Sequence, residues 1–251
     1  MEKVLQAIDA SCEQYVEQLK ELLRIPSVST DPAHADDVRR ASEWMRAHFE
    51  SMGLKAQIFE TPRHPVCFAE WNGAPGKPTV LFYGHCDVQP VEPLDEWRTQ
   101  PFDPQVIDGN LVARGSSDDK GQMFTHVKAV EAWLKANGTL PVNVKFLIEA
   151  EEEIGSPNLP AWLSENRELF MADVIVISDT SQFGPGLPSL CTGLRGIASF
   201  EISVRTAESD LHSGSFGGAV PNAIVVLSKI LAGLHDADGS VSVPGFYDGV
   251  A

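Results

Sequence analysis

The chain has 251 residues, of which 43% are hydrophobic and 22% are charged, which is ordinary for a globular protein that buries a core. Its formal net charge is -16, and the acidic residues are spread along the chain rather than gathered in runs. Nucleic acids and anionic membranes attract basic surfaces, so this balance argues against both as partners. The four cysteines form no C-x-x-C pair, which argues against a thiolate zinc knuckle.

The N-terminal stretch mixes acidic and apolar residues at helical spacing. It predicts an amphipathic helix that stops before Pro26, because the residue before a proline disfavours the helical conformation. The stretch lacks the basic segment and the unbroken apolar run of a secretory signal. No apolar run approaches the roughly 18 residues of a membrane span. We therefore expect a cytoplasmic protein.

Strands and helices are expected to alternate through the next part of the chain. A helix is predicted over 36–52, followed by the short strand KAQIFE, and further helical stretches follow Gly121 and precede residue 173. Three apolar runs predict strands buried on both faces, namely TVLFYG (79–84), VNVKFLIEA (142–150) and DVIVIS (173–178). This alternation predicts an α/β fold with a mostly parallel sheet flanked by helices, whose ligands gather at the carboxyl ends of the strands.

The pattern changes after Cys191. The run GLRGIASFEISVRT (193–206) predicts a strand, and a glycine-rich loop then leads to a helix over 223–234. We expect one domain over residues 1–192 and the start of a second, smaller α+β domain over 193–251. Because no further element completes that second domain, we expect the sequence to be part of a longer protein.

His85 and Asp87 follow directly after the predicted strand at 79–84. Two residues apart in an extended segment, both side chains point the same way, so Asp87 can accept a hydrogen bond from the ring nitrogen of His85 that does not bind a metal. Taken alone, this short motif is better explained by a single histidine with an incidental acidic neighbour.

Asp118 and Asp119 precede a glycine and a predicted helix in ARGSSDDKGQ (113–122). By themselves they fit acidic residues at a helix N-terminus, where the macrodipole favours anions. A carboxylate with two oxygens can also bridge two cations, and a loop just before a helix would hold it rigidly. The motif alone favours the helix N-terminus, with the metal bridge as the alternative.

Three consecutive glutamates, Glu151 to Glu153, follow the predicted strand at 142–150. Adjacent carboxylates at a strand end repel one another, and a nearby cation would relieve that repulsion. One glutamate can then bind a metal while its neighbour takes the proton of a metal-bound water. A solvated acidic turn is the alternative.

Asp179 ends the third apolar run. Its simplest role is an N-cap of the following segment. However, three predicted strands each deliver a histidine or a carboxylate at the carboxyl end, which independent surface residues would rarely do. A set of histidine and carboxylates without cysteine suits zinc, manganese or cobalt, and an active-site pair of ions more than a closed structural site.

The sequence also resembles the di-zinc metallopeptidase family of carnosinases, aminoacylases and succinyl-diaminopimelate desuccinylases, most closely its cytosolic nonspecific dipeptidase and carnosinase branch. The motifs that carry the resemblance occur in the family's order: LLRIPSVST (22–30), GHCDVQP (84–90), EWRTQPF (96–102), ARGSSDDKG (113–121), EAEEEIGS (149–156), ISDT (177–180), GLRG (193–196) and DLHSG (210–214). The resemblance implies a zinc-exopeptidase-like catalytic domain over 1–192 and the start of a lid that mediates dimerisation over 193–251.

Carried over by position, the resemblance implies a ligand set for two zinc ions. His85 and Asp179 would bind the first ion, Glu153 would bind the second, and Asp118 would bridge both. Asp87 would orient His85. The family's second zinc also takes a histidine close to the C-terminus of a longer chain, and nothing in this sequence corresponds to it.

The resemblance also implies the groups that perform the reaction. Glu152 would be the general base for a metal-bridged water, although Glu151 stays open as an alternative. His212 resembles a lid histidine that reaches into the partner subunit of dimeric members and stabilises an oxyanion. The implied function is a metallo-dipeptidase that acts as a homodimer on dipeptides or related small amides. The alternatives are an N-acyl-amino-acid deacylase and an inactive metal-binding or dimerisation fragment.

Overall fold

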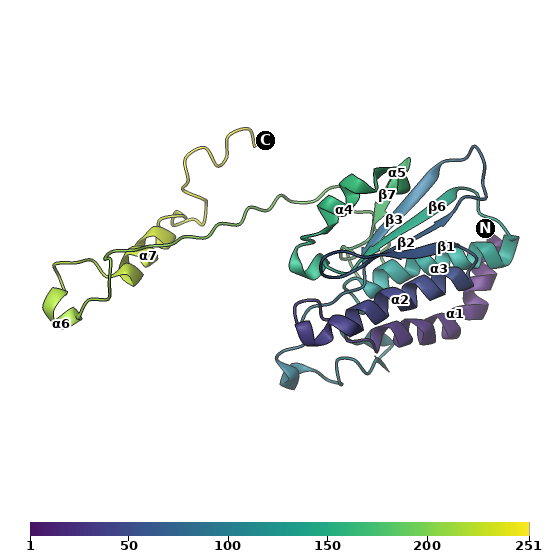
Figure 1. Cartoon of the computed structure of the whole chain (residues 1–251), viewed down its shortest axis with the longest axis horizontal. Coiled ribbons are helices and arrows are strands. Elements are labelled where there is room, and N and C mark those ends of the chain that lie inside the picture. The colour runs from purple at the N-terminus through teal and green to yellow at the C-terminus, as the bar shows by residue number, and fades with distance from the viewer. Residues whose placement is uncertain (251) are drawn as a thin grey trace. The chain divides into compact units, whose positions relative to one another are not determined.

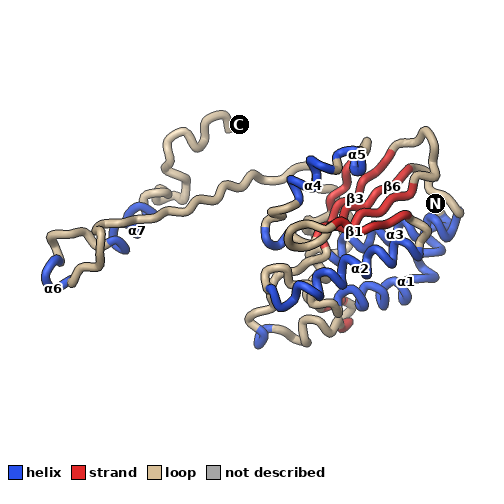
Figure 2. Tube along the Cα trace, viewed as in Figure 1, coloured by secondary structure: helices blue, strands red, loops and turns tan. Residues whose placement is uncertain are grey.

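The computed structural model describes residues 1–250. The chain divides into two compact units, Met1–Ser189 and a second that begins at Leu190. Each unit is described by itself. Figures 1 and 2 show the first unit as a sheet with helices packed against it. No helix in the described part of the chain has the length and apolar character needed to cross a membrane.

A five-stranded sheet forms the centre of the first unit, in the order β1-β2-β6-β3-β7. Its strands are β1 (Lys55–Phe59), β2 (Val66–Trp71), β3 (Thr79–His85), β6 (Asn143–Glu149) and β7 (Val174–Ile177). β6, β3 and β7 pair in parallel, whereas β2 is antiparallel to both β1 and β6. Only β2 is therefore reversed, which confirms the predicted mostly parallel α/β sheet. A separate hairpin joins β4 (Gln105–Ile107) to β5 (Asn110–Val112).

Helices cover both faces of the sheet (Figure 2). The helices of this unit are α1 (Glu2–Leu23), α2 (Ala35–Ser51), α3 (Lys120–Asn137), α4 (Leu159–Glu165) and α5 (Arg167–Phe170). α2 and α3 pack on one face, with α1 against α3. α4 contributes Trp162 to a smaller cluster on the other face. The helices predicted to end before Pro26 and at Gly53 are confirmed, and Gly53 has the positive φ of 86° that favours glycine after a helix.

The sheet carries a large hydrophobic cluster on one face and a small one on the other. Successive side chains of β3 point to opposite faces and so pack into both clusters. Leu81 packs into the small cluster with Trp162, while the neighbouring Phe82 packs against the large one and stacks on Phe146 at 5.0 Å between ring centroids. A central parallel strand buried on both faces is therefore fixed in register. This places the residue at its carboxyl end, His85, opposite Glu149 of β6.

Two predictions about individual strands are wrong. β7 is not buried on both faces, because it is the edge strand and its Val174, Ile175 and Ile177 are 51%, 59% and 56% exposed. The strand predicted over 193–206 is absent from the described second unit, where no neighbouring segment supplies the hydrogen bonds that a strand requires.

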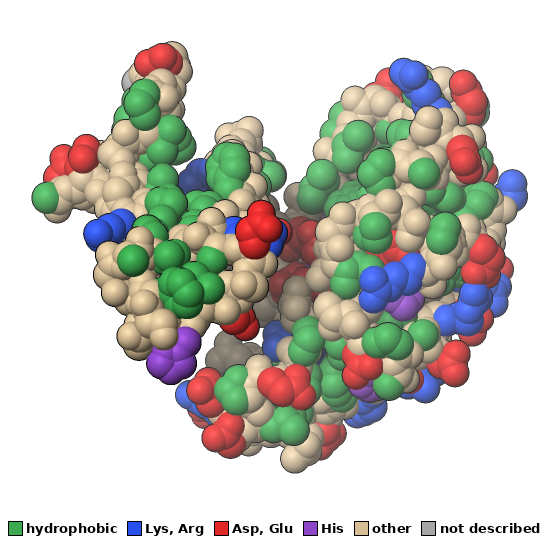
Figure 3. All heavy atoms as spheres, turned by 60° about the vertical axis from the view of Figure 1, so that its left-hand side comes forward, with side chains coloured by type: hydrophobic (Ala, Val, Ile, Leu, Met, Phe, Trp, Pro, Cys, Tyr) green, Lys and Arg blue, Asp and Glu red, His purple; other side chains and the backbone are tan. Residues whose placement is uncertain are grey.

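The second unit contains two helices, α6 (Ser213–Phe216) and α7 (Ala223–Ala232), and the latter confirms the helix predicted at 223–234. Asn222 caps α7 by accepting hydrogen bonds from two backbone amides of its first turn. Large apolar side chains are exposed here, as the green spheres of Figure 3 illustrate; Leu190, Ile197 and Phe200 are 92%, 94% and 87% exposed. That these residues begin a lid stays a prediction.

A buried charged cluster joins the first three helices. Lys128 Nζ of α3 donates to Gln18 of α1 at 2.6 Å, contacts His48 Nε2 of α2 at 2.7 Å and donates to Glu131 at 2.7 Å. Glu131 also pairs with Lys135 at 2.5 Å. Burial alone would raise the pKa of Glu131, but hydrogen bonds from His48, Lys128 and Lys135 outweigh it and hold that pKa below its ordinary value.

A Glu131→Gln substitution is expected to lower the free energy of unfolding at pH 7 by about 3 kcal/mol, because it leaves Lys128 buried without its counter-charge. Since the pKa of Glu131 is lower in the folded state, its contribution is complete above the unfolded value of 4.5 and declines as pH falls below it. Urea unfolding of both proteins between pH 7 and pH 3 measures this difference.

The matched control is Glu50→Gln, which removes an exposed ion pair with Arg46 on α2 and is expected to cost less than about 0.5 kcal/mol. A difference between wild type and Glu131→Gln that stays constant from pH 7 to pH 3 would contradict the role assigned to the cluster.

Candidate metal centre

The candidate site lies where three adjacent parallel strands end. His85 is the last residue of β3, Glu152 and Glu153 follow β6 in a short 3-10 turn, and Asp179 lies two residues after β7. Because the carboxyl ends of parallel neighbours meet at one edge of the sheet, residues far apart in sequence come together there. The loop before α3 adds Asp118.

His85 presents one ring nitrogen without a hydrogen-bond partner. The residue is fully buried, and its Nδ1 lies 3.1 Å from the main-chain carbonyl oxygen of Asp87, which can only accept. Nδ1 therefore carries a proton whether the ring is charged or neutral, and Nε2 is the nitrogen left to bind a metal once its own proton is released. Nε2 makes no hydrogen bond, although Asp118 Oδ1 lies 3.2 Å away and Asp179 Oδ2 3.6 Å away.

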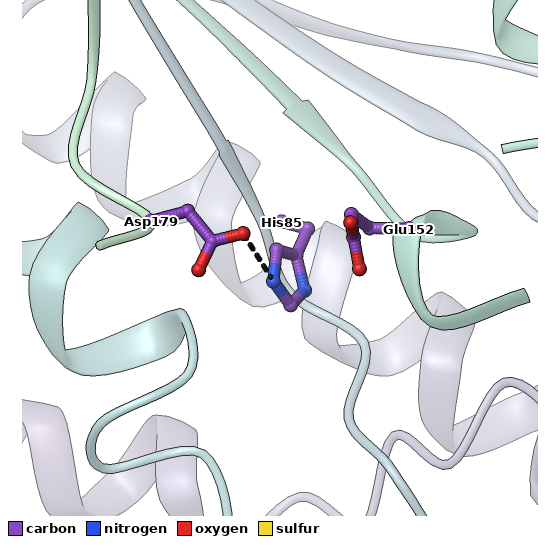
Figure 4. A group of neighbouring side chains, drawn as sticks. All are labelled: His85, Glu152 and Asp179. Carbon is purple, nitrogen blue, oxygen red and sulfur yellow. Dashed lines mark ion pairs between the residues drawn. The ribbon is translucent and has the colours of Figure 1, made fainter. Parts of the chain in front are cut away.

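Four carboxylates surround this nitrogen in two overlapping groups. His85 forms one group with Glu152 and Asp179, and a second with Asp118 and Glu153; within each group the potential ligand atoms lie within 4.8 Å of one another. Figure 4 shows the side chains of His85, Glu152 and Asp179 converging, with the ion pair between His85 and Asp179. The structure thus brings all four predicted ligands together, and it places Glu152, the predicted base, next to them.

The charges of this cluster are not balanced by the protein alone. Burial opposes the charged form of His85, but the carboxylates of Asp179 and Asp87 outweigh it and raise the pKa of His85 to about 12. Burial, together with neighbouring carboxylates, raises the pKa values of Glu152 and Glu153. Contact with His85 lowers the pKa of Asp179. A divalent cation would supply the positive charge that a proton on His85 otherwise provides.

The loop that carries Asp118 is anchored on both sides. Asp119 Oδ2 accepts a hydrogen bond from the backbone amide of His85 at 3.1 Å. A Cβ at Gly84 would lie 2.6 Å from that oxygen, so only glycine leaves room for it. Lys120, fully buried, donates to two carbonyl oxygens at and just after the end of α1, at 3.1 and 2.9 Å. Asp118 itself stays accessible, with its side chain 59% exposed.

Glu153 is held by a residue that the sequence did not single out. Gln89 Nε2 donates to Glu153 Oε2 at 2.7 Å, which fixes one carboxylate oxygen. Gln89 belongs to the motif that contains His85, but its contact lies 64 residues away in sequence and has no local signal.

Glu151, which the sequence left open as a base, belongs to neither group. It is 3% exposed, and both of its oxygens accept hydrogen bonds. Oε1 accepts from the backbone amide of His64 at 2.7 Å, and the side-chain amide of Asn158 donates to both oxygens at 2.9 and 3.0 Å. These bonds tie the turn to two other loops, which favours a supporting role for Glu151.

The structure refines the contact expected for Asp87. Its Oδ1 lies 3.5 Å from His85 Nδ1, farther than the main-chain oxygen that Nδ1 contacts. The carboxylate instead accepts hydrogen bonds from the backbone amides of Glu152 and Glu153, at 3.3 and 3.1 Å. Asp87 therefore connects the turn that carries two acidic residues of the site to the strand that carries the histidine.

His212 lies in the second unit, and its role stays a prediction. Its Nδ1 accepts a hydrogen bond from the backbone amide of Gly214 at 3.0 Å, at the N-terminus of α6. In a neutral ring the proton then resides on Nε2, which is free to donate.

Comparison with known proteins identifies the family. The model of "Peptidase family M20/M25/M40" matches residues 81–228, more than half of the chain. The chain belongs to this peptidase family. The predicted family is thereby confirmed. Membership in these metallopeptidases implies divalent metal binding, and the unpartnered Nε2 of His85 among four carboxylates fits such an ion.

Relatives within family M20 include two dipeptidases. The chain is 35% identical to the Beta-Ala-His dipeptidase of Rattus norvegicus, over 100% of this chain and 54% of the relative. It is 33% identical to the Cys-Gly metallodipeptidase dug1 of Schizosaccharomyces pombe, over 100% of this chain and 56% of the relative. The chain therefore spans about half the length of the curated relatives that it matches.

Solved structures of the same family share the fold. The dipeptidase Dug1p from Saccharomyces cerevisiae superimposes with a TM-score of 0.82 at 28% identity, over 99% of this chain and 55% of that one. Human carnosine dipeptidase 1 gives a TM-score of 0.80 at 31% identity, over 100% and 55% of the two chains.

Proposed function

We propose that the full-length protein is a zinc-dependent metallo-dipeptidase that hydrolyses the amide bond of dipeptides. The observation that carries this proposal is the grouping of one buried histidine with four carboxylates, where three parallel strands end and the loop before α3 adds Asp118. The names of the relatives, which act on Beta-Ala-His and Cys-Gly, support dipeptides as the substrate class.

The site residues would hold two zinc ions in a shared arrangement. His85 and Asp179 would bind one ion, Glu153 would bind the other, and Asp118, whose accessible carboxylate lies 3.2 Å from His85 Nε2 and groups with Glu153, would bridge both. Bound zinc would polarise the scissile carbonyl and lower the pKa of water at the site. Manganese and cobalt also accept this ligand set.

Glu152 would move the proton during hydrolysis. Its carboxylate would accept a proton from the water that attacks the carbonyl carbon, and would then donate that proton to the amine nitrogen as the carbon–nitrogen bond breaks. The backbone amide of Glu152 is held by Asp87, so the side chain starts from a fixed position. Because Glu152 also lies close enough to bind an ion, its role is tested separately below.

His212 would stabilise the negative charge that develops on the carbonyl oxygen. The hydrogen bond from Gly214 leaves Nε2–H as the donor, the form that an oxyanion requires. We propose that this histidine acts across a homodimer, so that each substrate site is completed by the second subunit.

The full-length protein is expected to hydrolyse β-Ala-His or Cys-Gly at least about tenfold more efficiently than N-acetyl or N-succinyl amino acids, because a dipeptide site would hold a charged amine that the acyl substrates lack. Dialysis against a chelator should abolish this hydrolysis, and added zinc should restore it. Amine release measured for each substrate, before and after metal removal, tests both statements.

Faster release from acylated amino acids would assign the protein to the deacylases instead. Equal turnover with and without the chelator would contradict the metal-dependent mechanism, and no turnover with zinc bound would favour a binding or dimerisation role.

A further inference from the structure

Ser29 lies in a buried segment that runs alongside the residues following β3. Val28 and Val88 form a parallel bridge, and the amide of Val88 donates to the carbonyl of Ser27 at 2.9 Å. Both serines are fully buried. This segment contains the IPSVST motif, for which the proposed function gives no role.

The hydroxyl of Ser29 donates to Asp87 Oδ2 at 2.6 Å. Asp87 is fully buried, and its other donors are the backbone amides of Glu152 and Glu153. Ser29 therefore supplies the only side-chain hydrogen bond to this carboxylate among the described residues. Without this donor, Oδ2 would keep only the backbone amide of Glu153, so the buried carboxylate would either turn or lose one of its hydrogen bonds uncompensated.

Ser29 is itself held rigidly. Its carbonyl oxygen accepts a hydrogen bond from Arg63 Nη2 at 2.9 Å and lies 3.2 Å from the ring Nε2 of His64, which donates because a carbonyl only accepts. The backbone amide of His64 in turn donates to Glu151, in the turn that carries the acidic residues. The Ser29 hydroxyl therefore donates to Asp87 from a backbone segment that Arg63 and His64 hold in place.

We propose that Ser29 is a positioning residue of the metal centre, which acts through Asp87 to fix the turn of Glu152 and Glu153 against His85. The proposal rests on the proposed function, because it assumes that these residues hold a metal. Hydrogen bonds one step beyond the ligands of metal sites typically change metal affinity by about 10–100-fold, and Ser29, which acts one step farther out through Asp87, is expected at the lower end of that range.

Ser27 offers a matched control. Its hydroxyl is also fully buried and also makes a 2.6 Å hydrogen bond, but to the main-chain carbonyl of Cys86, to which no candidate ligand side chain hydrogen-bonds within residues 1–250. Removal of either hydroxyl deletes one buried hydrogen bond from the same segment. Only Ser29→Ala affects a group that touches the candidate site.

The test is a zinc titration of the metal-free full-length protein against a chromophoric chelator, for wild type and for the variants Ser29→Ala, Ser27→Ala and Ser29→Thr. We expect Ser29→Ala to bind zinc about tenfold more weakly. Ser27→Ala and Ser29→Thr, which keeps the hydroxyl, should stay within about threefold of wild type. Thermal unfolding of the same samples verifies that each variant is folded.

Equal zinc affinity of wild type and Ser29→Ala would overturn the proposal while leaving the proposed function intact. An equal loss in Ser29→Ala and Ser27→Ala would overturn it as well, because the effect would then be one of local packing. A wild-type protein that binds no zinc would overturn this proposal and the metal centre together.

Discussion

A Glu152→Gln protein is expected to hydrolyse dipeptides about 10²–10⁴ times more slowly than wild type, while it keeps its zinc affinity within about threefold. Glutamine has nearly the shape of glutamate but cannot accept the proton of the attacking water. Initial rates at saturating zinc, together with zinc titrations of the same samples, separate proton transfer from metal binding.

Glu165→Gln, at the exposed end of α4, is the matched control and should keep wild-type turnover. A Glu152→Gln protein that loses zinc and activity in parallel would show that Glu152 is a ligand, as its distance to His85 and Asp179 also permits. Full activity of Glu152→Gln would leave the site without its proposed base.

A His85→Ala protein is expected to bind zinc more than about 100-fold more weakly than wild type. His85 is the nitrogen ligand common to both groups of the site, and its loss should cost more than the loss of a residue that only supports a ligand. The substitution also removes the group whose positive charge balances the carboxylates in the metal-free protein. Zinc affinity and the rate of turnover should therefore fall together.

His34→Ala serves as the comparison, since His34 lies at the start of α2, pairs with Asp37 and is outside both groups. Zinc affinity that is unchanged in His85→Ala, or reduced equally in His34→Ala, would contradict the assignment of His85 as a ligand.

The site residues at the carboxyl ends of strands were predictable, because buried parallel strands appear in the sequence as continuous apolar runs. Apolar runs define β3, β6 and β7, and the first polar residues after each run must lie at the same edge of the sheet. His85, Asp179 and the run Glu151 to Glu153 follow from that rule, whereas the choice of Glu153 as the ligand within the run came from the family resemblance. Asp118, in a loop, was placed as a ligand by family resemblance.

The supporting contacts were not predictable, because they join loops that are distant in sequence. Ser29 meets Asp87 across 58 residues, and Gln89 meets Glu153 across 64. No periodicity or short motif encodes such a pair, and only the folded chain shows which polar groups share a buried site. For the same reason, the sequence could not separate Glu151 from Glu152.

Errors in burial have a different cause. An apolar run predicts a buried strand, but the run does not reveal which neighbouring strand or helix buries it. β7 is the edge of the sheet among the described residues, so its apolar side chains are exposed. The segment 193–206 has strand-like composition yet lacks a partner to pair with.

The most direct test of the central claim is the position of zinc in crystals of the full-length protein grown with that metal. Anomalous diffraction at the zinc absorption edge is predicted to show two peaks among His85, Asp118, Glu153 and Asp179, with Glu152 facing them. Zinc peaks confined to other parts of the molecule, in a protein that hydrolyses dipeptides, would contradict the proposed metal centre.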